Sequence, residues 1–240
     1  MISLLEKVDM KELGIDGDRY QYNGYNLPRV TEIISSMIHE DFLMIWANNI
    51  GLYQRKKYKD VLQTAADKGA CVHDAIENYI QNKEEIDLDK VESVYRQEFN
   101  YAYASFKEWW SIVTKRNTII LMQEYKLVCP WFGGTLDLLI EIDGKIYLLD
   151  FKTSNHSSYK YFLQLAAYRY ILKYYHGIEI YGCGIIKLDK KSVYFEEFII
   201  DKSNPEFELF MNECEKTFLS LVYAYINRVN IERFYKKLFD

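Results

Sequence analysis

Cysteine is scarce in this sequence, and no two cysteines lie close together. The chain has four of them and no C-x-x-C pair: Cys71, Cys129, Cys183 and Cys214. Zinc knuckles and cysteine-ligated iron–sulfur clusters need closely spaced thiolates, so the sequence lacks the spacing for either. We therefore expect no iron–sulfur cluster, and we interpret the four side chains as reduced thiols in the core.

Long apolar runs and an excess of positive charge are also missing. No stretch approaches the about 18 to 20 apolar residues of a membrane span, and no basic segment followed by an apolar run opens the chain. We expect a soluble protein without a membrane partner, in the cytoplasm, or in the host-cell cytoplasm if a phage encodes it. The net charge of −5 argues against a protein that coats nucleic acid by bulk charge, although a local basic groove would not show in this total.

The chain does contain enough apolar material for a sizeable core, since 49% of its 240 residues are hydrophobic. It has no internal repeat, low-complexity tract or obvious linker, and we predict a single domain over residues 1–240. Residues 1–116 are predicted to be mostly helical after a turn-rich start with room for a short hairpin. The expected helices begin with Thr31 as N-cap, then cover 41–51 (closed by Gly51), 61–82 and 87–116.

From residue 117 the pattern changes to strands. We predict a strand over 118–128, two strands within 133–154, strands over 180–188 and 192–199, a helix over 157–175 and a last helix that starts near Pro205. A three-strand meander, a helix, two strands and a helix predict an α/β fold with a central mixed sheet flanked by helices. Residues 117–240 would form the sheet core.

Two of these strands are joined by Asp143-Gly144, a dipeptide typical of a type I′ turn. A turn centred there places Asp137 directly opposite Asp150, with Cβ atoms about 4.5 to 5.5 Å apart. Lys152 projects from the same face as Asp150. Since both faces of this hairpin are otherwise apolar, we expect central strands and two carboxylates removed from bulk water.

Two opposed carboxylates in such a place need compensation, because burying each unpaired charge costs several kcal/mol. Lys152 can neutralise one of them, whereas a divalent cation between Asp137 and Asp150 neutralises both. If the strand carried only one acid, a structural role would be the simpler interpretation, either as a buried Asp–Lys pair or as a cap of the strand end. The preceding Gly133-Gly134 favours the metal, since glycines allow a ligand to approach the backbone closely.

These residues resemble the catalytic core of the PD-(D/E)xK nuclease superfamily, and more fully its RecB-like exonuclease branch. The resemblance covers about residues 69–168 and rests on four elements in the family's order: Gly134-x-x-Asp137, Asp150-x-Lys152, His73 in the upstream GACVHDAIENYI, and Gln164-x-x-x-Tyr168 in QLAAY. Leu136 stands where other members have proline. The missing cysteine cluster makes the chain similar to cluster-free members, such as small phage exonucleases and the mitochondrial genome maintenance exonuclease.

The resemblance implies a restriction-endonuclease-like core and a metal-dependent DNA exonuclease in recombination, repair or genome processing. It implies hydrolysis of phosphodiester bonds at DNA ends with 5′-phosphate products. It also implies one or two Mg²⁺ or Mn²⁺ ions, and an imidazole ligand would suit Mn²⁺ better than Mg²⁺. The implied metal-binding positions are His73, Asp137, Asp150 and Phe151, and the implied catalytic residues are Asp137, Asp150, Lys152, Gln164 and Tyr168.

Three further assignments stay open. Glu124, on the strand before the hairpin, either reaches the metal through water or faces solvent. The run YQRKKYKD mixes basic and aromatic side chains that can follow a phosphate backbone and stack on bases, although such a run is more often a solvated helix face. Its DNA-binding candidates are Arg55, Lys56, Lys57, Tyr58 and Lys59. Arg29 is another candidate, and a helical N-terminal half arched over the strand would favour single-stranded ends.

Other functions remain in competition. A structure-specific or restriction-type endonuclease can use the same core. A nucleic-acid-binding protein that no longer cleaves is a second alternative, and the intact Asp137, Asp150 and Lys152 argue against it. A metal hydrolase with a different substrate lacks a supporting histidine cluster.

Overall fold

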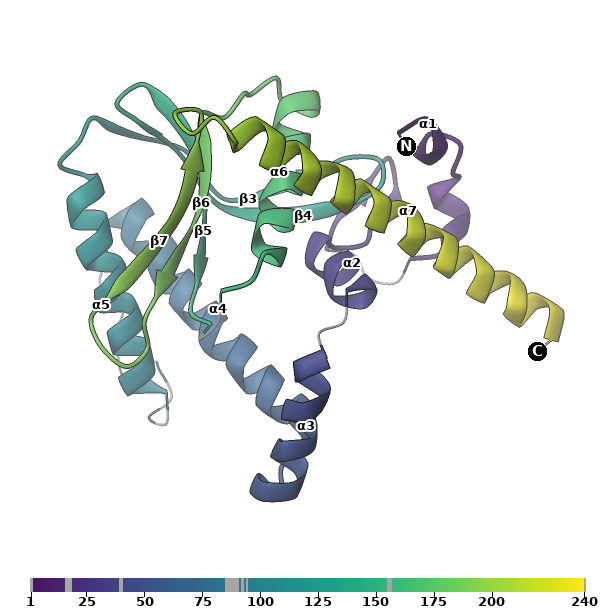
Figure 1. Cartoon of the computed structure of the whole chain (residues 1–240), viewed down its shortest axis with the longest axis horizontal. Helices are drawn as coiled ribbons and strands as arrows, with labels where there is room; N and C mark the ends of the chain where they lie inside the picture. Colours follow the sequence, from purple (N-terminus) through teal and green to yellow (C-terminus); the bar gives the residue numbers. More distant parts are fainter. Residues whose placement is uncertain are drawn as a thin grey trace.

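The centre of the protein is a five-stranded mixed sheet, seen in a computed structural model that describes residues 2–15, 19–38, 41–84, 91, 93, 95–154 and 157–239. The strands lie side by side in chain order: β3 (Thr118–Val128), β4 (Gly133–Ile142), β5 (Lys145–Lys152), β6 (Gly182–Leu188) and β7 (Phe195–Asp201). β5 and β6 run parallel, and the other neighbouring strands run antiparallel. The predicted α/β class with a mixed sheet between helices is confirmed (Figure 1).

The hairpin of β4 and β5 has the predicted register. Asp143 and Gly144 have φ angles of 52° and 77°, the left-handed values that a type I′ turn needs at both central positions. From this turn the strands pair without a shift as far as Leu138 opposite Leu149. The next position in the same register is the one that carries the two aspartates.

The residues before the sheet are mostly helical, as predicted. The helical elements are α1 (Ile2–Leu5), the short 3-10 helix η1 (Met10–Leu13), α2 (Val30–Met37), α3 (Asp41–Gln54), α4 (Tyr58–Asn82) and α5 (Arg96–Val113). A small hairpin of β1 (Gln21–Tyr22) and β2 (Tyr25–Asn26) lies in the turn-rich segment where the sequence left room for one.

Several predicted boundaries in this half are wrong. The N-cap of α2 is Arg29 and not Thr31. α3 runs past Gly51 to Gln54, because one exposed glycine costs a helix only about 1 kcal/mol. Arg55 then takes a left-handed φ of 52° that no helix continues. α4 begins at Tyr58, ahead of the predicted residue 61.

Later elements start after their predicted first residue. α5 begins at Arg96 and not at residue 87, and residues 87–90, 92 and 94 of that prediction lie outside the described part of the chain. α6 (Lys160–Tyr175) starts after residue 157, where the Ser158 hydroxyl accepts the N–H of Lys160 at 3.3 Å. β6 begins at residue 182 and not 180. β7 starts after residue 192, because Asp189 accepts the N–H and the hydroxyl of Ser192 and holds a bend there.

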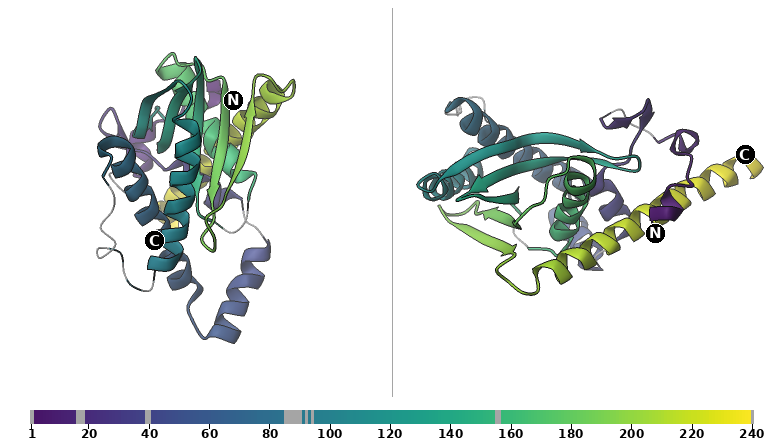
Figure 2. Two further views of the ribbon diagram at one scale, coloured as in Figure 1. Left: turned by 90° about the vertical axis from the view of Figure 1, so that its left-hand side faces the viewer. Right: turned by 90° about the horizontal axis from the view of Figure 1, so that it is seen from above.

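Helices cover both faces of the sheet. α4 and α5 lie over one face, and α6 with the long α7 (Phe207–Phe239) over the other (Figure 2). On the α5 side, Phe151 of β5 packs edge-on against Trp109 and Phe106, with ring centroids 5.4 and 5.6 Å apart. Because Phe151 lies between Asp150 and Lys152, this aromatic core fixes the end of β5 that carries both charged side chains.

The cysteines are free, and three of them are buried as expected. Cys71 differs, because it is only half-buried on α4. Its thiol borders a cavity and is not part of the closed core. Within the described part of the chain, no helix has the length and apolar content that crossing a membrane would need.

Candidate active site

The two aspartates lie where β4 and β5 stop pairing. Asp137 is 8% exposed and Asp150 is 1% exposed. Asp137 Oδ2 accepts the backbone N–H of Phe151 at 2.7 Å, so the carboxylate takes a donor that strand pairing would otherwise use. The Phe151 ring is buried in the aromatic core, and therefore only its main chain faces the predicted metal position.

Lys152 and Gln164 form one network with Asp150. The Lys152 ammonium lies 2.7 Å from Asp150 Oδ2 and donates to Gln164 Oε1 at 3.3 Å. Gln164 Nε2 lies 3.0 Å from Asp150 Oδ1 and 3.2 Å from the hydroxyl oxygen of Tyr168. One side chain of α6 thus holds both the acid and the lysine, which places Gln164 and Tyr168 beside the predicted catalytic pair.

The two glycines before Asp137 make room for tyrosines. A Cβ on Gly134 would lie 2.4 Å from Cε1 of Tyr168, and one on Gly133 would lie 2.7 Å from Cβ of Tyr20. The Cβ side of each glycine is therefore filled by an aromatic side chain, while Gly134 also lines the cleft in front of the cluster. The Tyr20 hydroxyl is 2.8 Å from Oγ1 of Thr135 on β4, a contact that the sequence patterns did not reveal.

Glu124 and His73 complete a cluster around Asp137. His73 Nδ1 lies 3.5 Å from Oε1 of Glu124 and 3.5 Å from Oδ2 of Asp137. One donor atom from each of the three residues lies within 4.8 Å of the others. The β3–β4 register between Gln123–Leu138 and Tyr125–Leu136 places Glu124 opposite Asp137, and Glu124 has a left-handed φ of 42°. Glu124 therefore lies beside His73 and Asp137, with a quarter of its side chain exposed.

The charges of this cluster perturb one another. Burial raises the pKa of Asp137 despite the nearby His73. Burial, together with the charge of Asp137, raises the pKa of Asp150 to about 6. Burial would lower the pKa of His73, but Asp137 and the Glu124 hydrogen bond outweigh it and raise that pKa to about 9. The carboxylates of Asp137 and Asp150 therefore lose their charge more readily than a carboxylate in water does.

This donor set fits a divalent cation. It offers carboxylate oxygens and one imidazole nitrogen, which Mg²⁺ and Mn²⁺ accept and which Mn²⁺ accepts more readily. Asp150 Oδ2 is buried and has no hydrogen bond of good geometry in the described structure, only the ion pair with Lys152. A cation beside Asp137 would favour the ionised form of both carboxylates and so oppose the burial and the like charges that raise their pKa values.

A cleft of about 270 Å³ opens onto this cluster, and residues of the N-terminal part line its other side. Arg19, Arg29 and Thr31 belong to that lining. The predicted DNA-binding run from Arg55 to Lys59 is fully on the surface and is not among the described residues that line the cleft. It connects the end of α3 to the start of α4, near the bottom of the view in Figure 1.

Comparisons with known proteins give only distant structural likeness. No protein-family model matches the sequence, and no curated protein is significantly similar to it. Among solved structures, the chain is similar to an alkaline exonuclease from Laribacter hongkongensis, with 14% identity, a TM-score of 0.34, and coverage of 54% of this chain and 69% of that one. The same exonuclease in complex with dAMP gives 15% identity, a TM-score of 0.35, and coverage of 58% and 73%.

Proposed function

We propose that the protein is a metal-dependent deoxyribonuclease, an exonuclease that hydrolyses phosphodiester bonds at DNA ends, favours single strands and leaves 5′-phosphates. The observation that carries the proposal is the grouping at the ends of β4 and β5. There, Asp137 lies beside His73 and Glu124, two side chains of types that can bind a metal ion. The Lys152 ammonium lies 2.7 Å from Asp150 Oδ2. Acids that hold a cation and a fixed ammonium beside them suit the charge that develops on a phosphate under attack.

Each charged group has a distinct task in this proposal. Asp137, with His73 and Glu124, would hold the cation, and Asp150 would face it from β5. A bound divalent cation polarises a phosphate oxygen and lowers the pKa of a coordinated water. Burial would lower the pKa of Lys152, but Asp150 and Asp137 outweigh it and raise that pKa, so the lysine stays an ammonium and acts as a compact positive charge.

Gln164 acts in the proposal as a positioning residue. Its two ends contact Lys152 and Asp150, at 3.3 and 3.0 Å, so neither charged side chain can move freely. The side-chain amide of Gln164 is itself held by the Tyr168 hydroxyl, which accepts a hydrogen bond from Gln164 Nε2 at 3.2 Å. Tyr161 adds a second support, because its ring lies 5.1 Å from the Lys152 ammonium.

The strand would enter through the basic side of the cleft. Arg29 and Arg19 line it and place positive charge in front of the buried acids. Phosphate contacts of this kind supply affinity without sequence preference. The exposed run of Arg55, Lys56, Lys57, Tyr58 and Lys59 would hold the strand further away, beyond the cleft.

Digestion of end-labelled oligonucleotides tests the proposal. Single- and double-stranded DNA, labelled at the 5′ or the 3′ end, is incubated with Mg²⁺, Mn²⁺ or EDTA. We expect metal-dependent release of mononucleotides or short products, stronger with Mn²⁺, and no cleavage of closed circular single-stranded DNA. Cleavage of the circular DNA would show that the protein is an endonuclease, because a closed circle has no end for an exonuclease to act on.

Matched variants separate catalysis from folding. Asp150→Asn and Lys152→Gln are expected to abolish cleavage, whereas Lys145→Gln, at the opposite end of β5, is expected to cut like the wild type. DNA binding without any metal-dependent cleavage, unchanged by Asp150→Asn, would instead identify a non-cleaving DNA-binding protein.

A further inference from the structure

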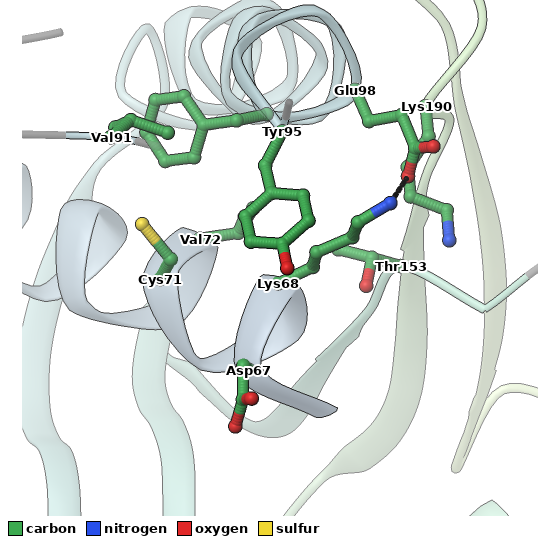
Figure 3. Close-up of a pocket in the computed structure, with 10 residues that line it drawn as sticks. Asp67, Lys68, Cys71, Val72, Val91, Tyr95, Glu98, Thr153 and Lys190 are labelled. Carbon is green, nitrogen blue, oxygen red and sulfur yellow. Dashed lines mark hydrogen bonds and ion pairs between the residues drawn. The ribbon is translucent and has the colours of Figure 1, made fainter. Parts of the chain in front are cut away.

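A second cavity lies on the other side of α4 from the candidate active site. It has a volume of about 210 Å³. Figure 3 shows its walls: Lys68, Cys71 and Val72 project from α4, and Tyr95 and Glu98 from the start of α5. At this volume it is smaller than the usual small-molecule site of about 300 to 1,000 Å³, and it has room for one planar ring system.

The cavity adjoins the catalytic end of β5. Thr153, which lines it, directly follows Lys152 in the chain. The backbone of α4 passes close to this end of β5, since a Cβ on Gly69 would lie 3.6 Å from Oγ1 of Thr153. Lys190, from the bend after the parallel neighbour β6, closes the same side. A nucleotide next to the bond being cut would therefore pass within reach of the opening.

The cavity combines an apolar floor with a polar rim. Val72 and Phe99 are buried and form part of the floor. At the rim, the Lys68 ammonium lies 3.1 Å from Oε2 of Glu98 and 4.9 Å from the centre of the Tyr95 ring. Such a lining offers flat apolar contact to a ring and hydrogen-bonding groups to its edge.

Lys190 gives the cavity a half-buried cation. No ion pair of its ammonium is found in the described structure, and burial lowers its pKa although Glu98 and Asp189 act in the opposite direction. A lysine whose charge is disfavoured by its surroundings gains from an anion placed beside it. A nucleotide carries both required parts, a planar base and a phosphate.

We propose that this cavity binds one unstacked base of the DNA strand being processed, with the base against Tyr95 and a neighbouring phosphate near Lys190. The inference rests on the proposed nuclease function and names a contact beyond its catalytic cluster. A pocket that holds one base would fix the register of the strand and so the position of the cut.

An abasic scan with a pocket-filling variant tests this. Single-stranded oligonucleotides that each lack one base, at successive positions, are bound to the Asp150→Asn protein and to Asp150→Asn with Cys71→Phe. One abasic position is expected to weaken binding by about 5- to 150-fold, as loss of one stacked base does. Cys71→Phe is expected to weaken the intact strand similarly and to abolish the effect of that abasic position.

Further variants provide a second test of the pocket and a control for surface charge. Tyr95→Leu keeps apolar bulk but removes the aromatic face, and it serves if Cys71→Phe does not fold, as judged by thermal unfolding. Lys190→Ala is expected to weaken binding, whereas Lys191→Ala, whose side chain is not among the described lining residues, is not.

The outcomes separate the two proposals. If the wild type neither binds nor cuts DNA, the nuclease proposal fails, and this one with it. If it cuts DNA but no abasic position responds to Cys71→Phe or Tyr95→Leu, only the base pocket is refuted. A last measurement tests the binding of free dAMP. If Cys71→Phe removes dAMP binding but no abasic position responds in the scan, the cavity binds a released mononucleotide, and the proposed contact with the strand is refuted.

Discussion

The substitution Gly134→Ala tests how tightly the candidate site is packed. The new methyl group would lie 2.4 Å from Cε1 of Tyr168 and 2.7 Å from its hydroxyl oxygen, distances that no methyl group keeps. Tyr168 is 2% exposed and its hydroxyl lies 3.2 Å from Gln164 Nε2, so moving its ring disturbs the packing and the hydrogen bonds of the site. Overpacking of this kind costs about 1–3 kcal/mol of unfolding free energy. For a domain of this size that lowers the unfolding temperature by about 2–4 °C for each kcal/mol.

A double-mutant cycle makes the prediction specific to Tyr168. Tyr168→Ala alone removes a buried aromatic ring and should cost about 3–5 kcal/mol. In the double variant the methyl group no longer meets a ring, so we expect the loss to match that of Tyr168→Ala and not the sum of both. Urea unfolding in EDTA measures all four proteins, since the linear dependence of unfolding free energy on urea gives each value.

The matched control is another glycine-to-alanine change. A Cβ on Gly69 meets nothing nearer than 3.6 Å, and Gly69 lies inside α4, where alanine is the better helix former by about 1 kcal/mol. Gly69→Ala should therefore stabilise the protein while Gly134→Ala destabilises it. Equal effects of the two changes, or additive losses in the cycle with Tyr168→Ala, would refute the packing argument.

Other predictions concern the charges of the site. Asp137→Asn should leave the metal-free protein at least as stable in urea, because burial disfavours the charge of Asp137, and a loss above about 1 kcal/mol would contradict this. Mn²⁺ at 100 times its Kd should stabilise the wild type by about 2.7 kcal/mol, and His73→Gln should reduce this gain for Mn²⁺ more than for Mg²⁺ in thermal unfolding. In EDTA, the raised pKa of His73 makes its contribution to stability complete below about pH 6.5 and lost as the pH rises through about 9, so urea unfolding of His73→Gln should lack this alkaline decline.

Local rules of the sequence account for the core of the site. The Asp143-Gly144 turn has one favoured backbone geometry, and that geometry alone determined which residues of β4 and β5 face each other. The helical spacing of Gln164 and Tyr168 likewise determined that they share a face of α6. Such predictions succeed because the deciding contacts lie within a few residues of the chain.

Contacts between distant segments could not be predicted in this way. Glu124 joins the cluster through the register of β3 on β4, and that register shifts between Ile120 and Met122 in a manner no local pattern signals. The Gly133–Tyr20 contact joins residues from two distant segments. The helix boundaries failed for a related reason, because single capping contacts such as that of Ser158 decide where a helix begins.

The helix α4 explains how one element can serve two sites. Ala70, His73 and Asp74 line the active-site cleft, whereas Lys68, Cys71 and Val72 line the second cavity. Both sets have the spacing i, i+3, i+4, and they are offset by two residues, which is about 200° of rotation at 3.6 residues per turn. The two faces are therefore nearly opposite, and the thickness of one helix separates them. Each site therefore takes its α4 side chains from its own face of the helix, and the substitutions in the second cavity leave Ala70, His73 and Asp74 in place.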